Sequence, residues 1–313
     1  MPSAVAYVTT TVATEADASV TVRLTVVVPL LPSETDRAVL ATRAAKARTP
    51  VEELRAGWLR RARETGFGRR TLAAVLPALR DEHQPDFVVV NGENAAGGVG
   101  ITRKTAQELL GLGVDAITLG NHAYRHREVY EYLDNEPRIV RPANFPKGSP
   151  GRGHTVVEAN GMRLGVINLS GQVFLEAVRS PFTEADALVS DLRGKADAIL
   201  VDIHAEVTSE KVALGWYLDG RVLACVGTHT HVPTADARVL PGGTAYISDV
   251  GMTGPRDGVI GVKKEMAIER FLTLTQVRFQ TATGDPWLNA VLVEGDSDGR
   301  ATSIRQLLVP AQL

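Results

Sequence analysis

Short apolar runs that each end in a polar cluster constrain the fold of this chain more than any other feature. The run VLACV at residues 222–226 has the length and composition of a buried strand, and GTHTH follows it directly. Three similar runs, FVVV, DAITL and AILV, lead into NGEN, GNH and DIHAE. Helical stretches separate these strands along the chain. The alternation predicts an α/β fold in which helices cover layers of sheet.

The expected elements follow one another regularly from residue 69 onward. The pattern predicts helices at residues 69–82, 102–112, 128–133, 186–192 and 210–217. It predicts strands at residues 86–91, 114–119, 139–143, 155–158, 163–169, 198–203, 222–226, 238–240, 245–247, 288–294 and 303–308. The pair Asn160-Gly161 is a strong signal for a hairpin turn. After residue 226, short strands and turns are expected to dominate to the C-terminus.

Residues 1–66 differ from the rest of the chain in composition and in the pattern of predicted elements. A Thr- and Ala-rich lead at residues 1–18 has no predicted structure, and residues 20–28 predict one strand. Two helices are expected next, at residues 33–47 and 50–64, opened by Ser33 and Thr49. This order weakly resembles a ribbon-helix-helix module, which would make the segment a dimeric DNA-binding unit. The alternative is an accessory extension.

Composition excludes several classes of function. The hydrophobic content of 44% and the charged content of 22% are typical of a soluble globular protein. The net charge of −2 gives no reason to expect DNA as a partner. The single cysteine, Cys225, excludes an internal disulfide and is expected to be a buried apolar residue in a reducing compartment. With no membrane-spanning run and no signal peptide in view, the expected location is the cytoplasm.

The polar clusters carry side chains that bind metal ions. His229 and His231 stand at i and i+2 on an extended backbone, so they project to the same side about 6–7 Å apart at Cα. That spacing suits one metal, or two metals about 3.5–4 Å apart. The other candidate ligands at strand ends are Glu93, Asn94, Asn121 and His204. Such a set fits Mn, Fe or Zn. Helix caps, satisfied polar turns and histidines without a ligand are the alternatives.

Taken together, NGEN, GNH, DIHAE and GTHTH resemble the calcineurin-like metallophosphoesterase superfamily. The longer phrases VNGENAAGGVGIT, RPANFP, HAEVTSEKVALGWYLDGR and VGTHTHVPTADARVLPGGTAYISDVGMTGP are similar to its branch of YmdB-type bacterial cyclic-nucleotide phosphodiesterases. The similarity covers about residues 68–308. It implies a layered β-sandwich flanked by helices, a dinuclear metal site at the strand ends, and a homo-oligomer. Residues 67–313 would form this domain behind an atypical extension at residues 1–66.

The resemblance also implies a role for each candidate residue. Glu93 would bridge two divalent cations, Fe or Mn first and Zn as an option. One cation would be completed by Asn121, His204 and His229, and the other by His231 and Asn94. His122 would be the general acid that protonates the leaving oxygen, while a metal-bound hydroxide attacks phosphorus. The implied substrate is a 2',3'- or 3',5'-cyclic nucleotide.

Several polar residues have simpler interpretations. Asn94 is alternatively a residue that holds its turn, and Asp202 and Glu206 are expected to support or cap rather than bind metal. Asp249 is expected to be structural. Three histidines outside the pattern are expected at the surface: His83, His126 and His154.

The start of the chain departs from the family's pattern. Family members begin with an apolar strand ending in Gly-Asp, and that Asp binds the metal that His231 also binds. Here Gly68-Arg69-Arg70 preserves the end of the following turn, but Ala62 stands where the Asp is expected. A misassigned start is one explanation, favoured by the abrupt beginning of the similarity. The others are that the strand at 20–28 fills the vacant position, with Asp36, Glu64 or nothing as the ligand, or that one metal is lost.

These departures leave three functions open. The first is a phosphodiesterase acting on cyclic nucleotides, with activity impaired if the ligand is missing. The second is a catalytically weakened regulator that binds metal or nucleotide. The third is a phosphomonoesterase or nuclease that uses the same site, since the metal ligands are shared and only the surrounding pocket differs.

Overall fold

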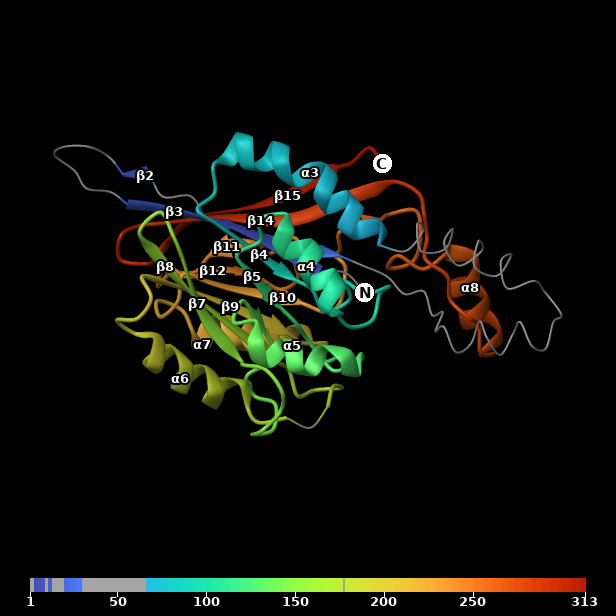
Figure 1. Cartoon of the computed structure of the whole chain (residues 1–313), viewed down its shortest axis with the longest axis horizontal. Coiled ribbons are helices and arrows are strands. Elements are labelled where there is room, and N and C mark those ends of the chain that lie inside the picture. The colour runs from blue at the N-terminus through green and yellow to red at the C-terminus, as the bar shows by residue number, and fades with distance from the viewer. Residues whose placement is uncertain (1–2, 9–10, 13–19, 30–65, 177) are drawn as a thin grey trace.

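The computed structural model describes residues 3–8, 11–12, 20–29, 66–176 and 178–313 (Figure 1). In this part of the chain two sheets pack face to face, and helices cover the outer side of each sheet. The helices expected at residues 33–47 and 50–64 lie outside the described residues. The expected α/β architecture, a layered β-sandwich flanked by helices, is confirmed.

The first sheet combines strands from both ends of the chain. Its order is β13 (Gly254–Pro255), β14 (Pro286–Gly295), β1 (Ser3–Val8), β3 (Val20–Pro29), β4 (Phe87–Asn91), β5 (Ala116–Thr118) and β6 (Ile139–Val140), with β15 (Ala301–Pro310) beside β14 and β2 (Thr11–Val12) beside β3. Helices α3 (Phe67–His83) and α4 (Arg103–Gly111) pack on its outer face. The short helices η1 (Arg127–Val129) and α5 (Tyr130–Asn135) precede β6.

The second sheet is mainly parallel. Its order is β11 (Arg238–Val239), β12 (Ala245–Ile247), β10 (Ala224–Thr228), β9 (Ala198–His204), β8 (Met162–Ser170) and β7 (His154–Ala159). β7 and β8 form the expected hairpin, because Asn160 and Gly161 adopt φ of 52° and 78° in its turn. Helices α6 (Pro181–Leu192) and α7 (Thr208–Tyr217) cover its outer face.

Alternating side chains of one strand supply two different cores. Val88 and Val90 of β4 pack towards α3 and α4, whereas Phe87 and Val89 face the second sheet. A third core lies between the second sheet and helices α6 and α7. A strand that is buried on both faces carries an uninterrupted apolar run, which explains why FVVV has no polar alternation.

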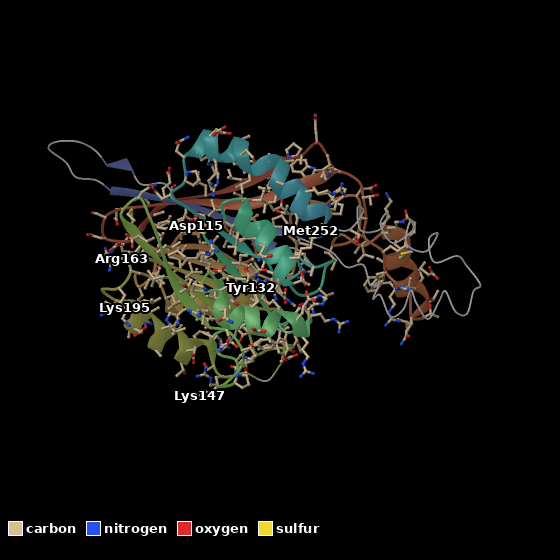
Figure 2. All side chains as sticks on the ribbon, viewed as in Figure 1. Asp115, Tyr132, Lys147, Arg163, Lys195 and Met252 are labelled. Atoms are coloured by element: carbon tan, nitrogen blue, oxygen red, sulfur yellow. The ribbon has the colours of Figure 1, made fainter. Side chains whose placement is uncertain are left out.

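The four central strands of the second sheet, β12, β10, β9 and β8, run parallel to one another, which brings their carboxyl ends together. Figure 2 shows Arg163, at the start of β8, beside Lys195, which precedes β9, at one end of the molecule. Met252, which follows β12, lies away from this end (Figure 2). The polar clusters that follow β9 and β10 are therefore placed at one edge of the sheet.

The N-terminal strands show one success and one error of the sequence prediction. The strand expected at residues 20–28 is β3, which runs parallel to β4 with Leu24 beside Phe87. The absence of structure expected at residues 1–18 is wrong for β1 and β2; β1 pairs with β14 through Ala6 and Val291. Local composition did not indicate β1 because its partner is distant in the sequence.

Helix α8 (Lys264–Thr273) was not predicted in the region after residue 226, where short strands and turns were expected to dominate. It buries only Ala267, and its apolar residues at helical spacing, Ile268, Phe271 and Leu272, are exposed. Phe271 and Leu272 are 77% and 80% exposed on it. Across the described ranges, every helix is too short or too polar to cross a membrane.

Candidate metal centre

The candidate site lies where strand ends of the two sheets meet. Asn91 ends β4, and its side-chain amide donates a 3.0 Å hydrogen bond to the Asp202 carboxylate of β9 in the other sheet. The hydroxyl of Thr118, at the end of β5, donates to the same carboxylate. These bonds join the two sheets directly beneath the polar clusters. All six side chains expected to bind metal follow or end strands β4, β5, β9 and β10.

Glu93 is at the centre of this group, with no exposed surface. Its Oε1 accepts a 2.8 Å hydrogen bond from the backbone N–H of His122, and its Oε2 accepts one of 2.9 Å from the Asn94 side chain. His204 Nε2 lies 3.1 Å from the same Oε2. A buried carboxylate with contacts to three neighbours is placed to bind a cation on either side of it.

The electrostatics of Glu93 favour its ionised form. Burial alone raises the pKa of this carboxyl group, but His204 and His122 outweigh burial through their charge and hydrogen bonds. The pKa of Glu93 therefore lies well below its ordinary value. The carboxylate is available as an anionic ligand at neutral pH.

His204 Nε2 has more close neighbours than hydrogen bonding can explain. It lies 3.0 Å from Asn121 Oδ1, 3.1 Å from Glu93 Oε2 and 3.1 Å from His229 Nδ1. One imidazole nitrogen carries at most one proton, so these contacts cannot all be hydrogen bonds at the same time. Ligands about 2.1 Å from an octahedral ion stand about 3.0 Å from one another. The contacts around His204 have the spacing of atoms that share a cation.

His231 supplies a second observation of the same kind. Its side chain is buried, and among the described residues neither of its ring nitrogens has a hydrogen-bond partner. Leaving buried polar atoms without partners is costly unless another group satisfies them. His229, in contrast, has Nε2 2.9 Å from the Glu206 carboxylate. Ring nitrogens without a partner in the described part of the chain fit a role of His231 as a metal ligand.

The donor set fits divalent cations when carboxylate, amide and imidazole groups are counted together. Among the described residues, no group of three His, Cys, Asp or Glu side chains meets the geometry of a metal centre by itself. The amide oxygens of Asn121 and Asn94 complete the set, and Asn121 Oδ1 contacts His204 directly. Mixed oxygen and nitrogen ligands of this type suit Mn, Fe or Zn.

His122, the expected general acid, stands at the rim of the group. Its side chain is 30% exposed, and its Nδ1 lies 3.2 Å from Asn94 Oδ1 and 3.3 Å from Glu93 Oε1. Asn94 thus contacts both the central carboxylate and the candidate acid. The imidazole is held on one side by these contacts, and it remains accessible to a substrate on the other.

Two glycines make room for the candidate ligands. A Cβ at Gly120 would lie 2.4 Å from the His204 ring, and one at Gly227 would lie 1.8 Å from the backbone oxygen of Ser248. No side chain fits at either position without movement of a ring or of the backbone. The glycines of GNH and GTHTH are therefore part of the packing of the site.

The hydroxyl of Thr228, which the sequence prediction did not include, orients His204. Thr228 Oγ1 lies 2.9 Å from His204 Nδ1 and donates a 2.8 Å hydrogen bond to Asp202. Burial raises the pKa of Asp202. Asp202 therefore supports His204 through Thr228, which agrees with its expected supporting role. Only the strand register, which places Thr228 beside His204, could have indicated this link.

One of the three histidines outside the strand-end clusters does not lie at the surface as expected. His83 was expected at the surface, but it is buried, with 7% of its surface exposed. It is the last residue of α3 and follows Leu76 and Leu79 on the buried face of that helix. His126 and His154 are half-buried.

We expect the metal-free chain to lose stability in mild acid. Burial and the nearby His204 lower the pKa of His229 to about 3, and burial holds the pKa of His231 well below its ordinary value. Below about pH 6.5 the unfolded chain binds protons that the folded chain excludes. The free energy of unfolding should therefore fall by up to about 1.4 kcal/mol per pH unit for each histidine.

Urea unfolding of the metal-free chain at pH 7, 6 and 5 measures this slope. His229→Gln should unfold with a smaller slope, because it removes one of the two groups. Identical slopes for the variant and the parent chain would contradict the assignment to His229.

The chain is similar to known proteins in sequence and in structure. Residues 65–307 match the model of a family described as YmdB-like protein. A curated relative from Bacillus subtilis (strain 168), 2',3'-cyclic-nucleotide 2'-phosphodiesterase, is 49% identical over 243 residues, covering 77% of this chain and 92% of the relative.

Two solved structures have the same fold as the described chain. A hypothetical protein from Thermus thermophilus is 42% identical, with a TM-score of 0.72, covering 78% of this chain and 94% of that one. A novel phosphatase from Mycoplasma pneumoniae is 35% identical, with a TM-score of 0.73, covering 79% of this chain and 90% of that one. The match of the family model and the identity to these proteins lead to one conclusion: the chain belongs to the YmdB-like family.

Proposed function

We propose that this chain is a metal-dependent phosphodiesterase that hydrolyses cyclic nucleotides. The observation that carries the proposal is the crowding around His204 Nε2, where Asn121, Glu93 and His229 all place ligand atoms at 3.0–3.1 Å. The name of the Bacillus subtilis relative, which is 49% identical, supports a 2',3'-cyclic nucleotide as the substrate. A 3',5'-cyclic nucleotide is the second choice.

Two divalent cations would be held by the candidate ligands. Glu93 would bridge them, and one cation would also bind Asn121, His204 and His229, while the other would bind His231 and Asn94. When bound, the cations supply charge that stabilises the attacking and leaving oxygens of an in-line displacement. Fe or Mn is proposed first, and Zn also suits these donors.

His122 would protonate the leaving oxygen of the substrate. The backbone N–H of His122 donates to Glu93, which ties the position of the acid to the carboxylate at the centre of the site. Contacts with Asn94 Oδ1 and Glu93 Oε1 orient the ring, and its 30% exposure leaves it within reach of solvent and substrate. A histidine can hold and release a proton near neutral pH.

The N-terminal segment is proposed to complete the first sheet. β3 runs parallel to β4, so we propose that it stands in for the family's usual first strand, with residues 67–313 forming the rest of the domain. Asp36 and Glu64, the candidates for the missing ligand, lie outside the described residues. The homo-oligomer and the cytoplasmic location remain predictions from the sequence.

Metal content and hydrolysis, measured together on the full chain, test the proposed function. After chelation and reloading with Mn²⁺, we expect two cations per chain and turnover of 2',3'-cyclic AMP that chelator removes. 3',5'-cyclic AMP and p-nitrophenyl phosphate serve as comparison substrates. Bound cations without turnover of any substrate would favour a regulator, and preferred hydrolysis of the monoester would favour a phosphomonoesterase. Either result would overturn the proposal.

A further inference from the structure

We propose that Lys211, Thr230 and Asp249 form a latch that fixes the loop between His229 and His231 and thereby sets the affinity for the cation bound by His231. The three residues are positioning residues, since they act through the loop. This inference rests on the proposed function, in which His231 is a metal ligand. It assigns roles to Lys211 and Thr230, and it explains the structural role expected of Asp249.

Asp249 connects three segments through a single carboxylate. Its Oδ2 accepts hydrogen bonds from Lys211 Nζ at 2.8 Å and from Thr230, through the backbone N–H at 2.9 Å and the hydroxyl at 2.7 Å. Its Oδ1 accepts a bond of 2.9 Å from the N–H of Gly251. The carboxylate follows β12, the ammonium comes from α7, and Thr230 follows β10. The latch therefore ties α7 and the segment after β12 to the loop at residues 229–231, which follows β10.

The ion pair at the core of the latch is fully enclosed. The side chains of Lys211 and Asp249 are 2% and 1% exposed. Removing both charges from water offsets much of their attraction, so such a pair adds little net stability compared with apolar side chains of equal size. A buried pair of this kind instead restricts the conformations that its surroundings can adopt. Here the restricted neighbour is Thr230, between two candidate ligands.

The loop needs such a restraint because its backbone is strained. His229 and His231 have φ of 103° and 73°, in the left-handed region that non-glycine residues rarely adopt. Conformations of this kind persist only where surrounding contacts enforce them. Thr230 is the residue between them, and Asp249 holds both its N–H and its hydroxyl.

The ring of His231 differs from those of the other candidate ligands in its hydrogen bonding. Among the described residues, no hydrogen-bond partner fixes either of its nitrogens. His204 has Thr228, and His229 has Glu206, to orient them. The direction of the His231 imidazole therefore depends on the backbone that the latch fixes. Release of the latch should weaken one metal site and leave the site at His204 in place.

A conservative pair of variants at Thr230 tests the latch in the full chain. Thr230→Val keeps the shape of the side chain but removes the hydroxyl bond to Asp249, and Thr230→Ser keeps the bond. Asp249→Asn removes the charge that pairs with Lys211. Calorimetric titration with Mn²⁺ should show that the Val and Asn variants bind one of the two cations at least about tenfold more weakly. The Ser variant should bind both cations like the parent chain.

A control variant with lower stability separates a loss of loop positioning from a general loss of stability. Leu79→Ala creates a cavity in the core beneath α3, away from the ligands, and should lower the melting temperature of the metal-free chain without changing either affinity. If Thr230→Val and Asp249→Asn bind both cations as tightly as the parent chain, the latch is overturned and the proposed function stands. If the parent chain binds no Mn²⁺, both proposals fail.

Discussion

Gly120→Ala is expected to reduce hydrolysis of 2',3'-cyclic AMP by about 100-fold or more, because displacement of a catalytic group by about 1 Å has an effect of this size. A Cβ at this position would lie 2.4 Å from both Nε2 and Cδ2 of His204. The ring would have to leave its place beside Asn121 and Glu93, which breaks the closest set of candidate ligands. Rate measurements with saturating Mn²⁺, together with Mn²⁺ titration, would show whether cation binding is lost with turnover.

Gly111→Ala is the matched control for this substitution. Gly111 is the last residue of α4, and a Cβ there would meet no atom within 4 Å. Alanine favours a helix more than glycine does, so this variant should keep full activity and gain slightly in stability. Activity of Gly120→Ala equal to that of Gly111→Ala would contradict the placement of His204 in the site.

His122→Ala is expected to lower kcat for 2',3'-cyclic AMP by about 10²–10⁴-fold, the usual contribution of a general acid. The loss should depend on the leaving group. Bis(p-nitrophenyl) phosphate releases a phenolate that needs little protonation, so the variant should retain most of the parental rate on that substrate. Because the ring lies at the rim of the ligand group, with 30% exposure, cation binding should stay close to that of the parent chain.

The comparison of the two substrates distinguishes an acid from a ligand. A variant that loses both activities equally, together with one cation, would show that His122 binds metal instead. His126→Ala is a suitable control, because this half-buried histidine lies four residues further along the chain and contacts the backbone oxygen of Val99. It should leave both rates unchanged.

The sequence predicted that the candidate ligands would lie close together because strand ends have a simple geometry. Parallel strands place their carboxyl ends at one edge, so polar clusters after β9 and β10 had to meet there. The cluster after β4 joined them because the sheets face each other, with Asn91 bonded to Asp202. Residue types then limited the chemistry to oxygen and nitrogen ligands. The proximity of Glu93 and His204 followed from the strand ends and from the facing sheets.

The remaining features depend on contacts between distant segments. Nothing in the sequence near Lys211 indicates that its ammonium meets Asp249, 38 residues away. Thr228 lies in the GTHTH cluster, and only the strand register shows that it stands beside His204. β1 gains its place from β14 at the other end of the chain. Tertiary contacts decided each of these cases.

The hydrogen bond between Asn91 and Asp202 and the contact of Asn121 with His204 have a consequence for folding. These pairs are separated by 111 and 83 residues, and each pair links one sheet to the other. The ligand set is therefore complete only after the two sheets have docked, which is a late event for contacts of such long range. A cation binds only when the two sheets are docked, so its binding free energy adds to the stability of the docked state. The time course of metal uptake during refolding would therefore report the last assembly step.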